Sequence, residues 1–233
     1  MEVKCVWEHN GCDTLLYATD YIGAYTRGKN LEEALDKMPR EIKSYQLWSN
    51  QDVNDDMEFV IVQDVNSSLF ICDADSDVIF DSEKAPMSER EYKRLKSLAL
   101  KSAKDFLFLY NSIPDKSSVF PPERKTFYGK VPRSAHSMYE HTKNVNKYYF
   151  SEIGIDADNN GDIYECRRRG FDELERNENF LSNGIIEGSY GELWSLRKVI
   201  RRFIWHDRIH AKAMYRMVIK ASQLTKIPNP FYF

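Results

Sequence analysis

Short apolar runs at the spacing of β-strands characterise the first 80 residues. Runs at residues 3–7 and 14–18 flank Asn10-Gly11, a dipeptide that is typical of hairpin turns. Further apolar runs predict three more short strands, the last of them at a sheet edge, over residues 59–62, 69–72 and 78–80. A polar turn at residues 64–68 separates the first two of these.

One helix is predicted among these strands. Apolar positions recur at helical spacing after Asn30, a residue that suits an N-cap, and they predict a helix over residues 31–45. Pro39 lies inside this range and predicts a kink or a break, because proline cannot donate a helical hydrogen bond. The first part of the chain therefore reads as a small α/β unit.

After Pro86 the apolar period changes from two residues to 3.6, the spacing of amphipathic helices. Capping-box patterns start at Ser88 and Ser189. Four helices are predicted, over residues 89–113, from 133 or 134 to 154, over 164–183, and from 189 to 222 or 223. Residues 114–132 predict a long ordered loop. Four helices of about 20 or more residues without an intervening strand indicate a bundle.

The change of period predicts two domains, residues 1–85 and residues 86–233, and an α+β fold class. In this class a small N-terminal α/β domain precedes a four-helix bundle. Charge divides in a similar way: residues 1–80 hold sixteen Asp and Glu against six Lys and Arg, a net charge of −10, so the remainder carries +7 of the overall −3. The opposite charges leave two alternatives open: the two domains dock against each other, or each has its own solvated surface.

Composition excludes several protein classes. With 42% hydrophobic and 30% charged residues, a packed core is expected and disorder is not. No apolar run reaches the roughly 18 residues of a membrane helix, and the N-terminus lacks the apolar segment of a signal peptide. The four cysteines form no CxxC pair, which argues against a zinc ribbon and a disulfide framework. We therefore expect a cytoplasmic protein without a membrane partner.

Two histidines on the last predicted helix are candidate metal ligands. His206 and His210 stand four residues apart, so both imidazoles project from one helix face, one turn apart. That face is otherwise apolar and is expected to point into the bundle. An HxxxH pair can present two nitrogen ligands to a divalent metal ion, although an inward histidine is more often a core residue. The motif is not that of a zincin, because Asp207 follows the first histidine.

A third ligand has to come from another helix. His141 lies on the apolar face of the second predicted helix. His136 points about 140° away from it and is predicted to lie at the surface, as is His9 at the hairpin turn. Residues 156–162 resemble the start of an EF-hand loop, but an arginine stands where the loop needs its final glutamate, so we expect a solvated turn.

These helices resemble the DinB/YfiT-like superfamily. The resemblance covers roughly residues 88–225 and rests on residues 132–141 with Tyr148-Tyr149, and on residues 196–210. Members of that family are four-helix bundles with one metal-ligating histidine on helix two and an HxxxH pair on helix four. The resemblance implies a site of His141, His206 and His210 with open positions for water or substrate.

For activity, the resemblance implies a divalent transition metal ion, Zn(II), Ni(II) or Fe(II), acting as a Lewis acid. Several characterised members are thiol-dependent transferases. The leading hypothesis is thus a metal-dependent thiol S-transferase or a hydrolase acting on a small molecule, with a low-molecular-weight thiol as one substrate. Glu140 and Asp207 are candidate bases by proximity in sequence, and Cys166 is a weaker candidate nucleophile. Bundles of this family often form dimers, so the resemblance leaves open that this protein is a homodimer.

The N-terminal part is similar to HicB-like domains. The similarity lies in residues 6–11, 23–26 and 30–35, and it implies a fold of a β-hairpin plus a helix, related to double-stranded-RNA-binding domains. Such domains often serve as antitoxins. The alternative function is accordingly a non-catalytic binding or regulatory protein, including a toxin–antitoxin or nucleic-acid role. The charge of −10 argues against nucleic acid on this half.

Charged residues on the last predicted helix need partners. Asp207 faces inward, where it can orient a ligand imidazole or pair with Arg167 or Arg168 of the third helix. The opposite face carries a basic stripe bordered by large apolar residues, which is typical of a covered surface. We expect the acidic N-terminal domain to dock on residues 194–220 and nucleic acid not to bind there. The stripe consists of Arg197, Arg201, Arg208 and Lys212.

Overall fold

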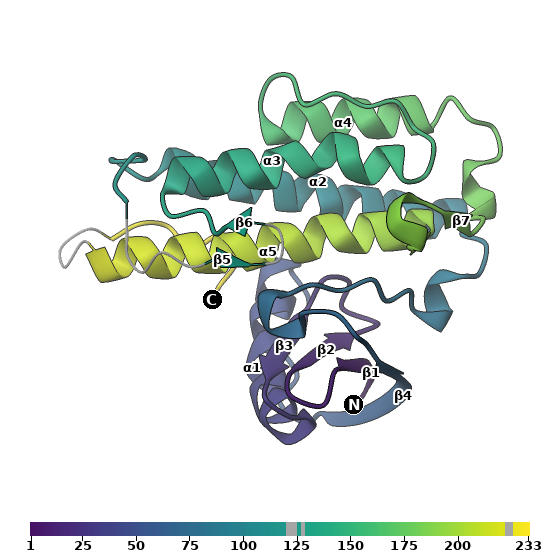
Figure 1. Cartoon of the computed structure of the whole chain (residues 1–233), viewed down its shortest axis with the longest axis horizontal. Helices are drawn as coiled ribbons and strands as arrows, with labels where there is room; N and C mark the ends of the chain where they lie inside the picture. The colour runs from purple at the N-terminus through teal and green to yellow at the C-terminus, as the bar shows by residue number, and fades with distance from the viewer. Residues whose placement is uncertain (120–124, 127–128, 222–225) are drawn as a thin grey trace.

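The computed structural model describes residues 1–119, 125–126, 129–221 and 226–233. It confirms the α+β class: a four-stranded sheet and one helix occupy the N-terminal part, and four further helices follow (Figure 1). Those four helices lie alongside one another, and the sheet and the first helix lie beneath the last of them in this view. None of the helices described is long and apolar enough to cross a membrane.

The N-terminal sheet has both faces covered. Its strand order is β3-β2-β1-β4, with β4 parallel to β1 and the other pairs antiparallel. Alternate residues of β2 enter two clusters: Leu16 packs with the first helix, α1, whereas Tyr17 packs with Trp205 of the last helix. The elements are β1 (Glu2–His9), β2 (Thr14–Ala18), β3 (Tyr25–Gly28), β4 (Glu58–Asn66) and α1 (Leu31–Trp48).

Two of the predicted N-terminal strands are wrong. Residues 69–72 and 78–80 carry no strand, and β4 instead continues through most of the predicted polar turn. The side chain of Gln63 explains why residues 78–80 form no strand, because it donates to the carbonyl of Ile79 (3.1 Å) and accepts from the backbone N–H of Asp81 (2.9 Å). These two bonds hold the segment where a strand ladder was expected. Strand β3 was not predicted from the sequence.

Helix α1 begins as predicted but does not break. The side chain of Asn30 accepts from the backbone N–H of Glu33, as expected of an N-cap. The helix then continues through Pro39 to Trp48. An interior proline costs about 3 kcal/mol, but Met38 and Ile42 on either side are buried in the core and keep the helix in place.

Four helices make up the rest of the core. Helices α2 and α3 each pack against both α4 and α5, so the four share one interior. The first three start at side chains that accept from a backbone N–H three residues later, namely Ser88, Ser134 and Asp162. Their bounds are α2 (Glu89–Asn111), α3 (Ala135–Ser151), α4 (Ile163–Leu174) and α5 (Leu196–Ala221).

The connection between α4 and α5 differs most from prediction. Helix α4 ends nine residues early and α5 starts late, so the expectation of four helices of 20 or more residues is wrong. Asn183 and Tyr190 have φ values of 52° and 62°, which continuous helices exclude. Between α4 and α5 the chain instead forms a short hairpin of β7 (Ile186–Glu187) and β8 (Leu193–Trp194).

The predicted loop over residues 114–132 contains a second short hairpin. It pairs β5 (Lys125–Thr126) with β6 (Gly129–Lys130). Residues 120–124 and 127–128 of that loop lie outside the described residues. The predicted end of the last helix, at residue 222 or 223, also lies outside them.

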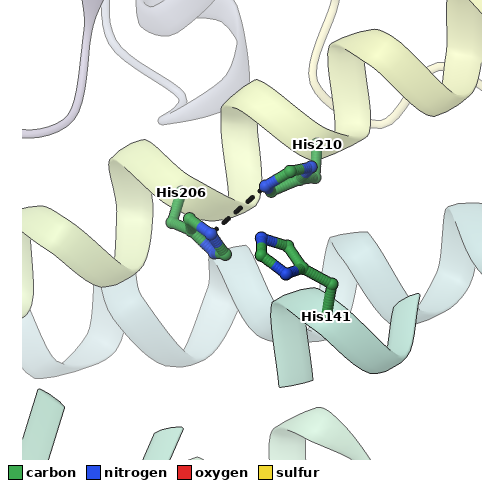
Figure 2. A group of neighbouring side chains, drawn as sticks. All are labelled: His141, His206 and His210. Atoms are coloured by element: carbon green, nitrogen blue, oxygen red, sulfur yellow. Dashed lines mark hydrogen bonds between the residues drawn. The ribbon is translucent and has the colours of Figure 1, made fainter. Parts of the chain in front are cut away.

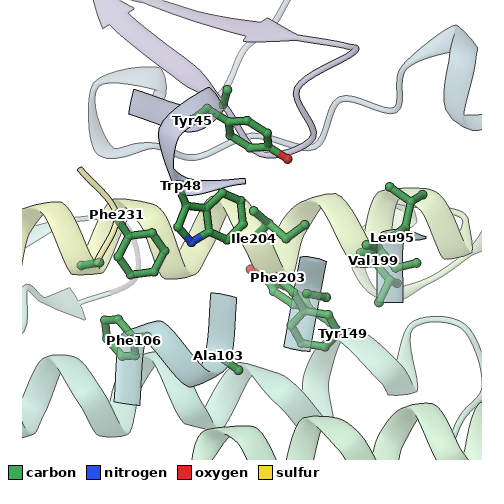
Figure 3. Packing of buried hydrophobic residues seen from close by; sticks show 14 of the residues in the cluster. Tyr45, Trp48, Leu95, Ala103, Phe106, Tyr149, Val199, Phe203, Ile204 and Phe231 are labelled. Carbon is green, nitrogen blue, oxygen red and sulfur yellow. The ribbon is translucent and has the colours of Figure 1, made fainter. Parts of the chain in front are cut away.

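One hydrophobic core joins the N-terminal part to the helices. Tyr45 and Trp48 of α1 lie beside Ile204 of α5 and beside Phe231 near the C-terminus (Figure 3). The rings of Trp48 and Phe231 stack with centroids 5.7 Å apart. The turn before β3 comes so close to α5 that a Cβ on Gly23 would lie 2.6 Å from a methyl carbon of Ile204.

Buried carboxylates of the N-terminal part pair with cations of α5. Glu41 of α1 accepts from Arg208 (Nη2, 2.7 Å) and from Lys212 (Nζ, 2.8 Å). Glu83 likewise accepts from Arg201 (Nη2 to Oε2, 3.1 Å). Both glutamates and both arginines are buried, so each charge requires its partner.

We expect Gly23→Ala to lower the free energy of unfolding by about 1–3 kcal/mol. The alanine would combine an unfavourable φ of 88° with a clash against α5. Gly11→Ala is the matched control, because Gly11 has a φ of 83° but open space around it, and it should lose only the smaller backbone contribution. Urea unfolding of both variants measures the difference, and equal losses would contradict a tight contact at Gly23.

Candidate metal centre

Three histidines converge between α3 and α5 (Figure 2). His141 extends from α3, and His206 and His210 extend from α5, one turn apart. One ring nitrogen from each histidine lies within 4.8 Å of those from the other two. The Nε2 atoms of His206 and His210 are 3.2 Å apart. The structure thus brings together the three residues that the sequence singles out.

Aromatic packing between α3 and α5 sets this geometry. Phe203 of α5 meets Tyr149 and Phe150 of α3 with ring centroids 5.4 and 5.1 Å apart. Because Phe203 lies three residues before His206, this contact fixes which face of α5 meets α3. The ring of Tyr149 also lies 6.1 Å from that of His206. The candidate ligands therefore stand on packed helices, which hold side chains more precisely than loops do.

Burial favours the neutral form of all three imidazoles. His206 is buried, and His141 and His210 are half-buried. Burial lowers the pKa of His141, and burial together with the neighbouring histidines lowers the pKa of His206 well below its usual value. Burial and the proximity of His141 lower the pKa of His210 to about 3. Neutral imidazoles offer the free lone pairs that a metal ion needs.

The donor set suits a metal ion. Within a neutral pair, only one hydrogen bond can join the Nε2 atoms of His206 and His210. The Nδ1 atom of His206 is buried and has no hydrogen-bond partner in the described part of the chain. Over the same residues, no carboxylate or thiol joins the three histidines as a fourth ligand. Three imidazole nitrogens with further positions left for water or substrate are typical of catalytic zinc sites and related metals.

Asp207 forms an ion pair with Arg167, one of the two alternatives that its inward position left open. Its fully buried carboxylate accepts from both terminal nitrogens of Arg167 on α4, at 2.5 and 3.1 Å. The guanidinium also lies 4.3 Å from the ring centroid of Phe203. Asp207 thus links α4 to α5 beside the histidine pair, and its carboxylate is engaged by an arginine rather than a ligand imidazole.

The other two reactive candidates lie in ordinary environments. Glu140, next to His141 in sequence, forms an ion pair with Lys143 at 3.0 Å. Cys166 is fully buried, and its thiol donates to the carbonyl of Ile163. Burial raises the pKa of Cys166, which disfavours the thiolate that a nucleophile needs.

The remaining histidines and the EF-hand-like loop have their own partners. His136 is exposed, as predicted. His9 was expected to be exposed but is half-buried, with its Nε2 atom 3.0 Å from a carboxylate oxygen of Asp64 on β4. In the EF-hand-like loop before α4, the carboxylate of Asp158 accepts a hydrogen bond from Arg169 of α4 at 2.6 Å. A guanidinium thus neutralises the acid that a cation would use.

The acidic partners of the basic stripe were missed from the sequence. Glu41 lies on the buried face of α1 with Met38 and Tyr45, and an acid within an apolar stripe is a signal for a buried ion pair. Glu83 has no such signal, because it follows a loop of mixed composition. Only the packed structure shows that Glu83 faces Arg201.

We expect Asp207→Asn to lower the free energy of unfolding by about 3–5 kcal/mol, because it leaves the Arg167 guanidinium buried without a counter-charge. The matched control is Asp172→Asn, which removes an exposed pair with Arg168 on the same helix as Arg167 and should cost about 0.5 kcal/mol or less. Chemical denaturation measures both. A loss for Asp207→Asn as small as that of the control would contradict a tight buried pair.

Stability of the metal-free protein should fall as the pH drops below about 6.5. Burial lowers the pKa of His206 and His210 in the folded protein, so each histidine binds a proton more tightly in the unfolded chain. Their contribution to the free energy of unfolding is therefore complete above the unfolded-state pKa, and it is lost as the pH falls toward the folded-state pKa. For His210→Gln we expect the slope of unfolding free energy against pH, between pH 6 and 4, to be smaller by about 1 kcal/mol per pH unit. Parallel slopes for both proteins would show that His210 does not titrate in this way.

The histidine cluster thus combines close spacing, burial and lowered imidazole pKa values, and it could bind one metal ion. Compared with known proteins, the chain matches no protein-family model, no curated protein and no solved structure.

Proposed function

We propose that this protein is a DinB-like metal-binding protein, which binds one divalent transition metal ion through His141, His206 and His210. The observation that carries the proposal is the convergence of three imidazoles from two packed helices. The order of the ligands along the chain, one histidine on α3 and an HxxxH pair on the last long helix, supports the same assignment. Imidazole ligands suit Zn(II), Ni(II) or Fe(II).

The proposed activity is that of a thiol S-transferase or a hydrolase acting on a small molecule. A metal ion held by three histidines would act as a Lewis acid toward a thiol or a water molecule. The chain's own thiols do not compete for this role in the site, because Cys5 and Cys166 are buried in the core and Cys12 and Cys72 lie in the N-terminal part. A reacting thiol would therefore come from a low-molecular-weight substrate.

The ion pairs on α5 weaken a nucleic-acid role. Arg201 and Arg208 of the basic stripe are buried and engaged by Glu83 and Glu41, so they are not free to contact phosphates. A non-catalytic, regulatory metal-binding protein would keep the same site without turnover. Activity assays on metal-loaded protein with thiol and ester substrates separate that alternative from an enzyme.

Metal analysis tests the proposal directly. We expect the purified protein to bind about one equivalent of Zn(II), and His141→Ala and His206→Ala to reduce this to near zero, since two imidazoles seldom hold the ion alone. His136→Ala is the matched control, because this exposed histidine on α3 lies outside the cluster and its loss should leave binding unchanged. Circular dichroism confirms that each variant is folded. Wild-type metal content in both cluster variants would refute the site.

A further inference from the structure

Arg202 is the exception among the buried arginines of the described residues. Arg167, Arg201 and Arg208 each place two nitrogens on a carboxylate, with at least one contact of 2.7 Å or less. Arg202 is 9% exposed, yet among the described residues its only carboxylate contact joins Nη2 to Glu192 at 3.4 Å. Within the described part of the chain its Nε atom is buried without a hydrogen-bond partner, as is one nitrogen of each of the other three, so the difference lies in the weak carboxylate contact. This guanidinium therefore has unused donors.

The one nearby carboxylate in contact with Arg202 is shared. Glu192 also pairs with Lys198, and at the shorter distance of 2.9 Å. Among the described residues, Glu8 and Asp75 form no ion pair with Arg202 and act on it only at longer range, and burial raises the pKa of both, which favours their uncharged forms. The charge of Arg202 is thus incompletely balanced by the protein.

Aromatic rings hold Arg202 in place without satisfying its donors. Its guanidinium carbon lies 5.0 Å from the ring centroid of Trp205, 5.6 Å from that of Trp194 and 5.8 Å from that of Tyr149. Such cation–π contacts fix a guanidinium while leaving its edge free for hydrogen bonds. An arginine with a fixed plane and free donors is suited to a planar or tetrahedral oxyanion.

Arg202 stands beside the histidine cluster. It precedes His206 by four residues on α5, so the two side chains are neighbours on one helix face. The ring of Tyr149 lies beside both, 5.8 Å from the guanidinium and 6.1 Å from the His206 ring. A small molecule at the cluster could therefore reach the guanidinium with a second group.

We propose that Arg202 binds the oxyanion of a small-molecule substrate, a carboxylate or a phosphate, next to the proposed metal ion. The role of Arg202 in a reaction rests on the proposed function, whereas the binding of an anion to Arg202 does not depend on it. Arg202 would orient the substrate through hydrogen bonds to its acidic group, while the group to be transformed faces the three histidines.

The test measures binding of inorganic phosphate and of acetate to the full chain by calorimetry, with and without Zn(II). We expect at least one anion to bind, and Arg202→Gln to raise its Kd about tenfold or more. Arg202→Lys, which keeps the charge but loses the planar donor pair, should give an intermediate Kd. Arg168→Gln is the matched control, because it removes one exposed arginine from α4 and should leave anion binding unchanged. The anion that responds to Arg202 distinguishes a carboxylate substrate from a phosphorylated one.

Metal analysis of the same variants separates this inference from the proposed function. Arg202→Gln should keep its full metal content while it loses anion binding. An anion affinity that depends on Arg202 in metal-free protein would sustain the inference even if no metal binds. The inference is overturned if neither anion binds the wild-type protein, or if folded Arg202→Gln and Arg202→Lys bind both anions as the wild-type protein does.

Discussion

The charges buried along α5 constrain the rest of the structure. A guanidinium or carboxylate removed from water destabilises a fold unless an opposite charge meets it in good geometry. On α5 these partners come from four different parts of the chain. Glu41 meets Arg208, Glu83 meets Arg201, Arg167 meets Asp207, and Glu192 meets Lys198. The position of α5 is thereby fixed against each of these elements at once, and the histidine pair on α5 is fixed with it.

This arrangement relates the N-terminal part to the histidine cluster. Arg208 lies between His206 and His210 in sequence, on the side of α5 that faces α1, and the histidines lie on the side that faces α3. The same turn of helix therefore carries a structural ion pair on one face and the candidate ligands on the other. Glu41, which pairs with Arg208, belongs to the acidic first 80 residues, and Glu83, which pairs with Arg201, follows that segment closely.

The candidate ligands could be predicted from the sequence because they depend on local periodicity. The spacing of His206 and His210 fixes their common face, and the apolar pattern around His141 places it toward the interior. The identity of Asp207's partner needed the structure, because Arg167 and Arg168 both fit the sequence. Some elements and element ends were harder to predict. Hydrogen bonds from the side chain of Gln63 stand where a strand was predicted, and positive φ values at Asn183 and Tyr190 interrupt two predicted helices. Such effects depend on single side chains and on tertiary contacts that leave no periodic pattern.

The pairing of Glu41 with Arg208 also has a consequence for folding. The two residues are 167 positions apart, so the contact closes a very long loop. On a ribosome that makes about 5–20 residues per second, α1 emerges many seconds before its partner helix is synthesised. During that interval Glu41 remains in water, and the apolar face around it has no helix α5 to cover it. The nascent N-terminal part is therefore exposed to aggregation until the last helix is complete, which makes α5 the element that ends this vulnerable period.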